Sequence, residues 1–163
     1  MNTGIPILPA TLFRHVCGRC HSETMDQRVS FITLAVADVA RTRAFYVDGL
    51  GWQPIFEGDE VIMFAVADRV ILSLWSVDGF AAEIGQAPAS GIPPITLAHN
   101  LATSAEVDAV LTEAAALGAT VSQATRREWG GYSGYFCDPD GFRWEVAVNT
   151  GETGAFVLPP ASS

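Results

Sequence analysis

The sequence has few basic residues, few cysteines and no long apolar run, and each shortage excludes a class of function. Nine lysines and arginines stand against eighteen acidic residues, and the resulting net charge of −9 repels a phosphate backbone, so we expect no nucleic-acid partner. No apolar run approaches the length of about eighteen residues that a membrane-spanning helix needs, so we expect no membrane partner. The first thirty residues lack a basic start followed by an apolar block, which favours a cytoplasmic protein.

Cysteine is scarce, but two of the three cysteines are closely spaced. Cys17 and Cys20 form a C-x-x-C-H pattern with His21, which is the spacing of a haem-attachment motif. The same pair would supply half of a four-ligand zinc site, which His15 and His21 could complete. Neither export nor a helical haem fold is indicated, so we expect an incidental pair and no cofactor. Cys137 is expected to be a small buried hydrophobic residue.

An internal repeat organises the rest of the chain. Residues 32–35 (ITLA) recur as residues 95–98, and the pattern after each copy recurs too. After the first copy, Asp38 is a predicted helix N-cap, and Gly49 stands where a left-handed residue should end that helix.

The second copy is followed by a similar helix and then by strands. Thr103 and Glu106 form a capping box before a helix that Gly118 closes. Three strand-like runs follow each helix, and residues 138–141 (DPDG) form a strong turn before the last one. The six runs are 53–57, 61–66, 70–76, 120–125, 132–137 and 142–148.

The order β-α-β-β-β therefore occurs twice. We expect an α+β fold in which two βαβββ modules form a curled mixed sheet around a cleft. The predicted organisation is an N-terminal extension (1–27), one domain (28–149) with modules at about 29–78 and about 93–149, and a C-terminal tail (150–163).

Five short motifs carry a family resemblance: 36–39 (VADV), 45–46 (FY), 49–52 (GLGW), 138–141 (DPDG) and 144–146 (WEV). They resemble the opening and closing signatures of the vicinal oxygen chelate superfamily, over roughly residues 29–149. That superfamily includes glyoxalase I, extradiol dioxygenases, fosfomycin-resistance enzymes and bleomycin-binding proteins, so the resemblance implies a fold and not one activity. It also implies a homodimer, because related folds pair their modules across subunits.

The resemblance further implies four cleft positions at which metal-using members carry their ligands. In this chain those positions hold Phe31, Ser73, Pro94 and Glu145. Phe31 and Pro94 offer no ligand atom, and a serine hydroxyl is a weak ligand for transition metals. One carboxylate does not hold a divalent ion against water, so we predict a metal-free site.

The period of two along a strand predicts the other side chains of the cleft. With Glu145 opposite Gly134, Tyr132 and Phe136 share its face, and Ser73 shares a face with Phe64. The expected ligand-binding residues are Phe31, Thr33, Phe64, Ser73, Trp75, Thr96, Trp129, Tyr132 and Phe136. Such an aromatic cleft suits a small organic molecule.

Three residues have alternative interpretations. Glu145 is either a functional carboxylate, and then the candidate catalytic residue, or a remnant that hydrogen-bonds to threonine or tyrosine neighbours. Trp129, before two glycines, belongs either to a lid or to a bulge. His99 shares a face with Leu97, and a structural histidine facing the helix is favoured over a catalytic one.

Three functions are therefore compared, and the sequence leaves open whether the protein is an enzyme. The first is a metal-free binding protein that sequesters an antibiotic or carries a small molecule. The alternative is a metal-independent lyase or isomerase with Glu145 as general base. A metal-dependent glyoxalase or dioxygenase-type enzyme is the least favoured, because its ligands are not found.

Overall fold

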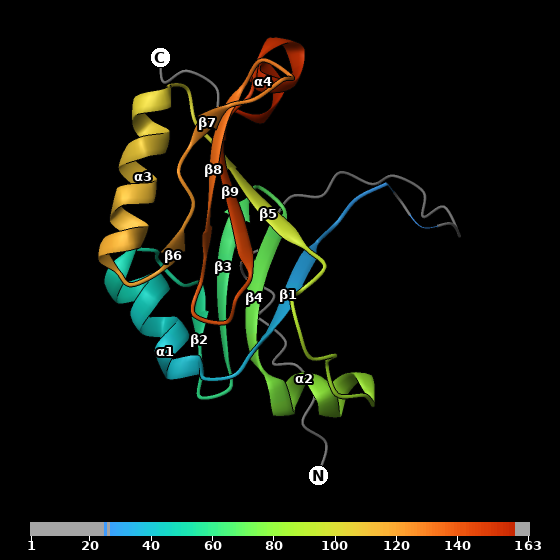
Figure 1. Ribbon diagram of the computed structural model, residues 1–163. Helices are drawn as coiled ribbons and strands as arrows, with labels where there is room; N and C mark the ends of the chain where they lie inside the picture. Colours follow the sequence, from blue (N-terminus) through green and yellow to red (C-terminus); the bar gives the residue numbers. More distant parts are fainter. Residues whose placement is uncertain (1–24, 26, 159–163) are drawn as a thin grey trace.

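The computed structural model describes residue 25 and residues 27–158, and the Cys17–Cys20 pair lies outside these residues (Figure 1). The chain forms two mixed sheets that do not close into a barrel, and the α+β prediction is confirmed. The first sheet has the order β1(Phe31–Val36), β4(Val70–Ser76), β3(Val61–Ala67) and β2(Phe56–Glu57). The second has the order β5(Thr96–Asn100), β9(Arg143–Val148), β8(Tyr132–Cys137) and β6(Thr120–Val121), and β7(Thr125–Arg126) also pairs with β8.

The helix of the first module begins as predicted and ends differently. Asp38 caps α1(Val39–Arg43) by accepting a hydrogen bond of 3.1 Å from the backbone N–H of Arg41. The chain then continues into a π-helical turn, η2(Ala44–Gly49), so Gly49 is still helical. Gly51 takes the left-handed conformation instead, with φ of 71°, and the expectation for Gly49 was wrong.

The helix of the second module follows the sequence signal at both ends. The predicted capping box is present at α3(Ser104–Ala116): the Thr103 N–H donates to Glu106 (2.8 Å), and the Glu106 N–H donates to the Thr103 hydroxyl (3.2 Å). Gly118 closes the helix with φ of 87°. Val107 and Leu111 are buried on the face that packs against the second sheet.

Two shorter helices lie where the sequence suggested none. The linker contains α2(Val77–Ile84), which begins where the Ser76 hydroxyl accepts from the Gly79 N–H at 3.1 Å. Within the predicted tail, residues 151–157 form α4(Gly151–Val157). No helix in the described part of the chain has the length and apolar character to cross a membrane.

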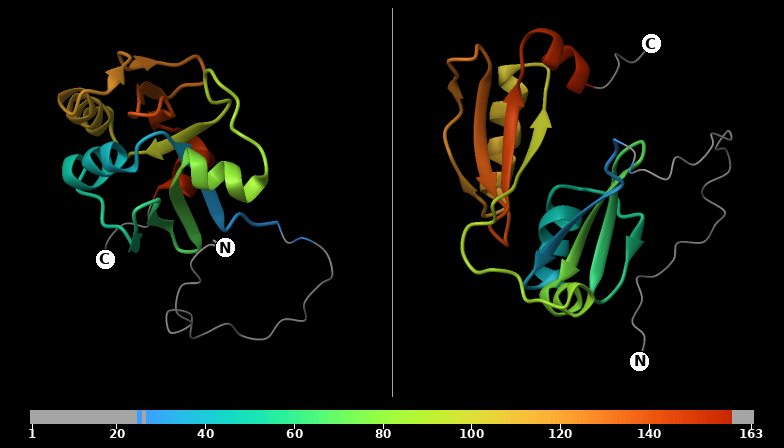
Figure 2. Two further views of the ribbon diagram at one scale, coloured as in Figure 1. Left: turned by 90° about the horizontal axis from the view of Figure 1, so that it is seen from below. Right: turned by 90° about the vertical axis from the view of Figure 1, so that its right-hand side faces the viewer.

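The two modules share one hydrophobic core. Helices α1 and α3 lie on the same side of the two sheets, to the left of the strands in Figure 1 and behind them in the right-hand view of Figure 2. Phe45 and Tyr46 of the first module join Phe136 and Trp144 of the second in this core. The Phe136 and Trp144 rings stack with centroids 6.0 Å apart. Each sheet therefore has a helix face in the core and an opposite face, called here its free face.

Candidate functional site

The free face of the second sheet carries a charged and aromatic cluster around Glu145. Glu145 lies on β9, paired with Ala98 of β5 and with Tyr135 of β8. The Arg127 guanidinium carbon lies 5.8 Å from the centre of the Tyr135 ring. Arg127 is fixed there because its Nε donates to the buried Ser133 hydroxyl at 2.8 Å.

The surroundings of Tyr135 disfavour its ionisation. Burial and, secondarily, the adjacent Glu145 carboxylate raise the pKa of the Tyr135 phenol, because both disfavour a phenolate. Tyr135 is a protonated phenol at neutral pH, as an ordinary tyrosine is, and can share a hydrogen bond with Glu145 or with a bound molecule. Arg127, Tyr135 and Glu145 together present a cation, a phenol and a carboxylate on one face.

The free face of the first sheet is less polar. Thr33 of β1 pairs with Ser73 of β4, and Ser73 pairs in turn with Met63 of β3. Ser73 is buried, whereas the Phe31 ring at the start of β1 is 49% exposed. Trp75 shares this face, but its indole nitrogen packs so closely on α2 that a Cβ at Gly79 would approach it to 2.4 Å.

The predicted partner of Glu145 was wrong by one residue. Glu145 pairs with Tyr135, and Gly134 pairs with Val146. The cause is the DPDG hairpin, in which Gly141 takes φ of 84° and adds one residue to the loop.

This shift of one residue moves two predicted site residues to the other face. Tyr132 and Phe136 lie on the helix face of the second sheet. The Tyr132 hydroxyl donates to Asp108 of α3 at 2.8 Å, and the Phe136 ring stacks on Trp144 in the core. Sequence reasoning missed Tyr135 for the same reason, although the positive φ that DPDG favours at its glycine was a signal for the extra residue.

Phe64 is displaced in the same way in the first sheet. It pairs with Leu72 on the helix face, and Met63 is the residue opposite Ser73. The turn at residues 68–69 is where it was expected, but the register shifts between Ala65 and Ala67, so one residue of β3 bulges out. Phe64 is 2% exposed and packs edge-on against Trp52.

The remaining predicted residues lie at the margins of the free faces. Thr96 is exposed at the start of β5 and pairs with Arg143. Trp129 is 50% exposed in the turn between β7 and β8, and its ring lies directly over Gly131, where any Cβ would collide with it. His99 shares the helix face of β5 with Leu97, as the strand period predicts.

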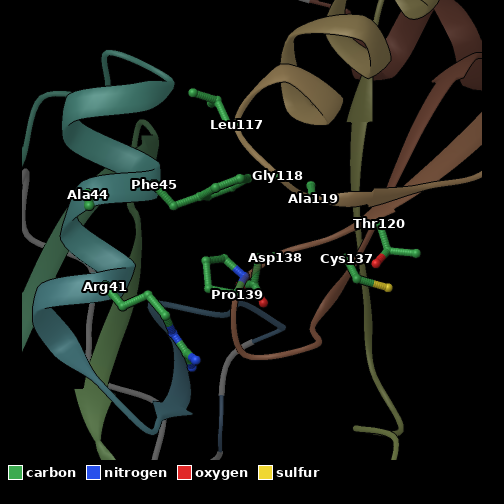
Figure 3. A pocket seen from close by; sticks show the side chains of 10 residues that line it. All are labelled: Arg41, Ala44, Phe45, Leu117, Gly118, Ala119, Thr120, Cys137, Asp138 and Pro139. Atoms are coloured by element: carbon green, nitrogen blue, oxygen red, sulfur yellow. The ribbon is translucent and has the colours of Figure 1, made fainter.

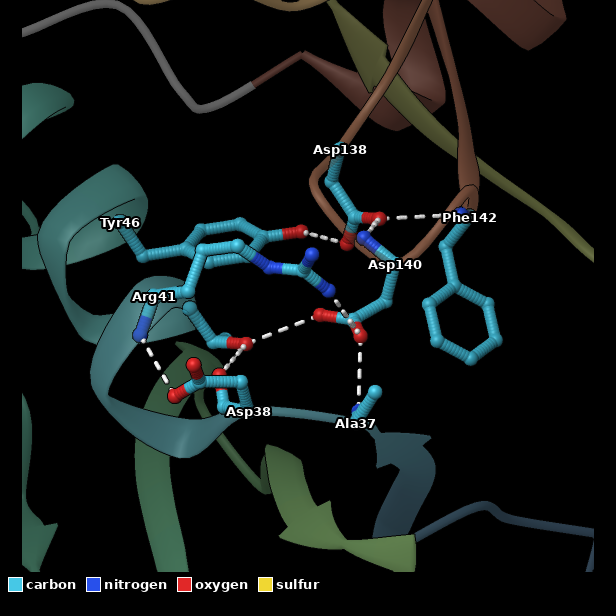
Figure 4. A network of polar contacts seen from close by, with 8 residues as sticks. Ala37, Asp38, Arg41, Tyr46, Asp138, Asp140 and Phe142 are labelled. Carbon is cyan, nitrogen blue, oxygen red and sulfur yellow. Dashed lines mark hydrogen bonds and ion pairs between the residues drawn. The ribbon is translucent and has the colours of Figure 1, made fainter.

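A polar network that the sequence did not predict joins the two modules (Figure 4). The buried Tyr46 hydroxyl donates to Asp138 at 2.7 Å and accepts from the indole N–H of Trp144 at 2.8 Å. Burial raises the pKa of Tyr46 and that of Asp138, because each charged form is desolvated. Every group in this network has a partner, so the network positions the last hairpin rather than presenting a reactive group.

Asp140 anchors the same hairpin to the first module. Its carboxylate accepts from the Ala37 N–H at 2.7 Å and from the Thr42 hydroxyl at 2.9 Å, and it pairs with Arg41 at 3.0 Å (Figure 4). The two aspartates of the DPDG turn therefore connect β9, which carries Glu145, to the first module, Asp140 at the start of α1 and Asp138 at Tyr46 of η2.

A hollow of about 480 Å³ lies where α1 meets the end of α3 (Figure 3). Phe45 and Leu117 form its apolar part, and Arg41 stands at its edge, held by Asp140. Cys137, which was expected to be buried, is a half-buried free thiol that also lines the hollow. We assign no ligand to this hollow.

The four positions of the family's metal ligands do not fit a metal ion. Phe31 and Ser73 lie on the first sheet, Glu145 lies on the second, and Pro94 comes just before β5. Only Glu145 offers an ionised ligand atom. Across the described residues, no three histidine, cysteine, aspartate or glutamate side chains come together as a candidate metal centre.

Comparison with known proteins gives a family and a fold. Residues 28–146 match the family model of the Glyoxalase/Bleomycin resistance protein/Dioxygenase superfamily. A glyoxalase-related enzyme from Fulvimarina pelagi is 34% identical, with 76% of this chain and 88% of that chain covered and a TM-score of 0.70. A lactoylglutathione lyase from Agrobacterium tumefaciens is 25% identical, with 76% and 95% covered and a TM-score of 0.60. No curated protein matches the chain.

Proposed function

Because the chain belongs to the glyoxalase/bleomycin resistance protein/dioxygenase superfamily, we propose that it binds a small organic molecule on the free faces of its sheets without a metal ion. The observation that carries the proposal is the chemistry of the four ligand positions, of which Glu145 alone has an ionised side chain. The lactoylglutathione lyase relative does not transfer its reaction to this chain at 25% identity.

The proposed site combines the two free faces. Glu145 and Tyr135 of the second sheet would anchor the polar part of the molecule, since a carboxylate and a protonated phenol accept and donate hydrogen bonds respectively. Phe31 and Thr33 of the first sheet, and Thr96 of the second, would contact its remainder. The role is that of a carrier or of a protein that sequesters an antibiotic, and the compartment predicted from the sequence is the cytoplasm.

The proposal includes a homodimer. Both free faces are turned away from α1 and α3, so the chain's own core does not use them (Figure 2). Phe31 is 49% exposed on one of them, and a second copy that brought its second sheet over the first would cover this ring. Such a dimer would place Glu145 of one copy opposite Ser73 of the other.

One observation supports an enzymatic alternative, a metal-independent lyase or isomerase. Glu145 lies beside Tyr135, whose ring has the Arg127 guanidinium over it at 5.8 Å. A carboxylate can remove an activated proton as general base, and a neighbouring phenol can return a proton to the product.

The substitution Glu145→Gln separates the two functions. The molecule that remains bound after incubation with a metabolite extract is identified by mass spectrometry and then mixed with each variant in the presence of a chelator. Loss of the carboxylate is expected to weaken binding about tenfold or more, since a hydrogen bond to a charged group contributes about 1.5–3 kcal/mol.

The matched control is Glu113→Gln, which removes an exposed carboxylate from α3 and should leave binding unchanged. Recovery of the molecule unaltered from wild type supports the binding function. Conversion by wild type but not by Glu145→Gln would favour the enzyme, and equal binding by both variants would remove Glu145 from the site.

A further inference from the structure

A second pocket lies at the seam between the two sheets, and its lining does not include Glu145, Tyr135 or Arg127. Its volume is about 480 Å³, within the range of small-molecule sites. Its walls come from the segment after η2, from β3, from β5 and from Trp144 of β9. We call it the seam pocket.

Three aromatic rings form one corner of the seam pocket. Trp52 meets Phe64 edge-on, with centroids 5.3 Å apart and planes at 81°, and meets Trp144 in the same way at 5.6 Å and 88°. Phe64 and Trp144 are only 2% and 7% exposed because the shared core holds them in place, so the half-buried Trp52 supplies most of the ring surface that is open to the pocket. Perpendicular rings present both a face and an edge, which is the surface that a further planar ring packs against.

The polar groups of the pocket carry no formal charge. No lysine, arginine, aspartate or glutamate belongs to its lining among the described residues, so a charged molecule would lose solvation there without compensation. The Trp144 N–H is already donated to Tyr46, which leaves that ring to offer only its π surface. The Gln53 amide nitrogen donates to Gly51 at 3.2 Å.

Among the described residues, two lining side chains have no hydrogen-bond partner: the His99 imidazole, which can donate and accept, and the Trp52 indole, whose N–H can only donate. The His99 imidazole makes no hydrogen bond or ion pair with any other described residue. Partial burial lowers the pKa of His99, so the ring is uncharged at neutral pH and has one N–H donor and one bare nitrogen as acceptor.

The bulge of β3 lies at the rim of this pocket. Val66 falls between the two register positions Ala65 and Ala67 and is 43% exposed. Bulges re-aim side chains and occur often beside functional sites.

We propose that the seam pocket is a binding site for an uncharged planar aromatic molecule that carries a hydrogen-bond donor. The ring lies in the corner formed by Trp52, Phe64 and Trp144, and its donor meets the bare nitrogen of His99. This site is separate from the proposed free-face site and goes beyond that function.

Indole is the probe, because it is planar and uncharged and has one N–H donor. Titration is followed through the side-chain N–H signals of the four tryptophans in 15N-labelled protein, assigned by single Trp→Phe variants. Saturable shifts are expected for Trp52 and Trp144, and shifts confined to Trp75 and Trp129 would overturn the proposal.

Two further probes test its chemistry: 1-methylindole lacks the donor and should bind about fivefold or more weakly, and indole-3-acetate carries a charge and should bind more weakly still.

Two variants test the location of the site and its polar contact. Val66→Trp fills the rim and should weaken indole binding at least tenfold, whereas Ala67→Trp adds the same side chain outside the lining and should leave binding unchanged. His99→Leu should abolish the preference for indole over 1-methylindole while keeping the ring in place. Unchanged binding by Val66→Trp, or an unchanged preference in His99→Leu, would contradict the proposal. Glu145→Gln should bind indole as wild type does, so the two proposals can fail separately.

Discussion

At the scale of single residues, the aspartates of the DPDG turn do more than their local chemistry suggests. Asp138 accepts from the N–H groups of Asp140 and Phe142 within its own hairpin, as the turn motif predicts. It also accepts from Tyr46, which lies 92 positions away in the sequence. The DPDG motif therefore determines both its own turn and the way in which the two modules meet. The sequence pattern of one segment contains no information about such a distant partner.

Tyr46→Phe is expected to lower the free energy of unfolding by about 2–4 kcal/mol, because it leaves the Oδ2 atom of Asp138 and the Trp144 N–H without their hydrogen-bond partner in the core. Urea unfolding followed by tryptophan fluorescence measures this change. Tyr132→Phe is the matched control: it removes the hydrogen bond to Asp108 near the surface and should have a much smaller effect. Equal losses in the two variants would show that the buried network does not stabilise the core.

At the scale of helices and strands, the sequence predicted which elements exist better than how they pair. The repeat, both helix N-caps and the six strand runs correspond to elements of the fold. Two registers were wrong, each by one residue, because a left-handed Gly141 lengthens one hairpin and a bulge near Val66 interrupts the other. Since side chains alternate along a strand, each error assigned the wrong residue to a free face. Phe136 was predicted where Tyr135 lies, and Phe64 was predicted where Met63 lies.

The capping box of α3 makes a prediction at this scale. Thr103→Ala removes the side chain that accepts from the Glu106 N–H, and it should lower stability by about 1 kcal/mol. Thr112→Ala in the same helix removes only a hydroxyl that donates to the Asp108 carbonyl, so it should be neutral or slightly stabilising. Thermal unfolding of both variants checks the difference, and a loss in Thr112→Ala as large as that in Thr103→Ala would refute the role of the cap.

At the scale of the whole molecule, one core serves both modules and leaves both free faces outside it. Helices α1 and α3 pack on the same side of the sheets, and the Tyr46–Asp138–Trp144 network closes the contact between the modules. Glu145 is half-buried and Phe31 is 49% exposed on these faces, so both side chains keep solvent-exposed surface outside the shared core. The sequence identified the fold through its motifs, but only the assembled chain indicates which residues share these surfaces.

The central claim, a small-molecule site that works without a metal, is tested most directly by native mass spectrometry after incubation with Zn²⁺, Ni²⁺ or Fe²⁺ and removal of excess ion. We expect a dimer whose mass contains no bound metal, in wild type and in Glu145→Gln alike. One divalent ion retained per chain in wild type and lost in Glu145→Gln would contradict the account.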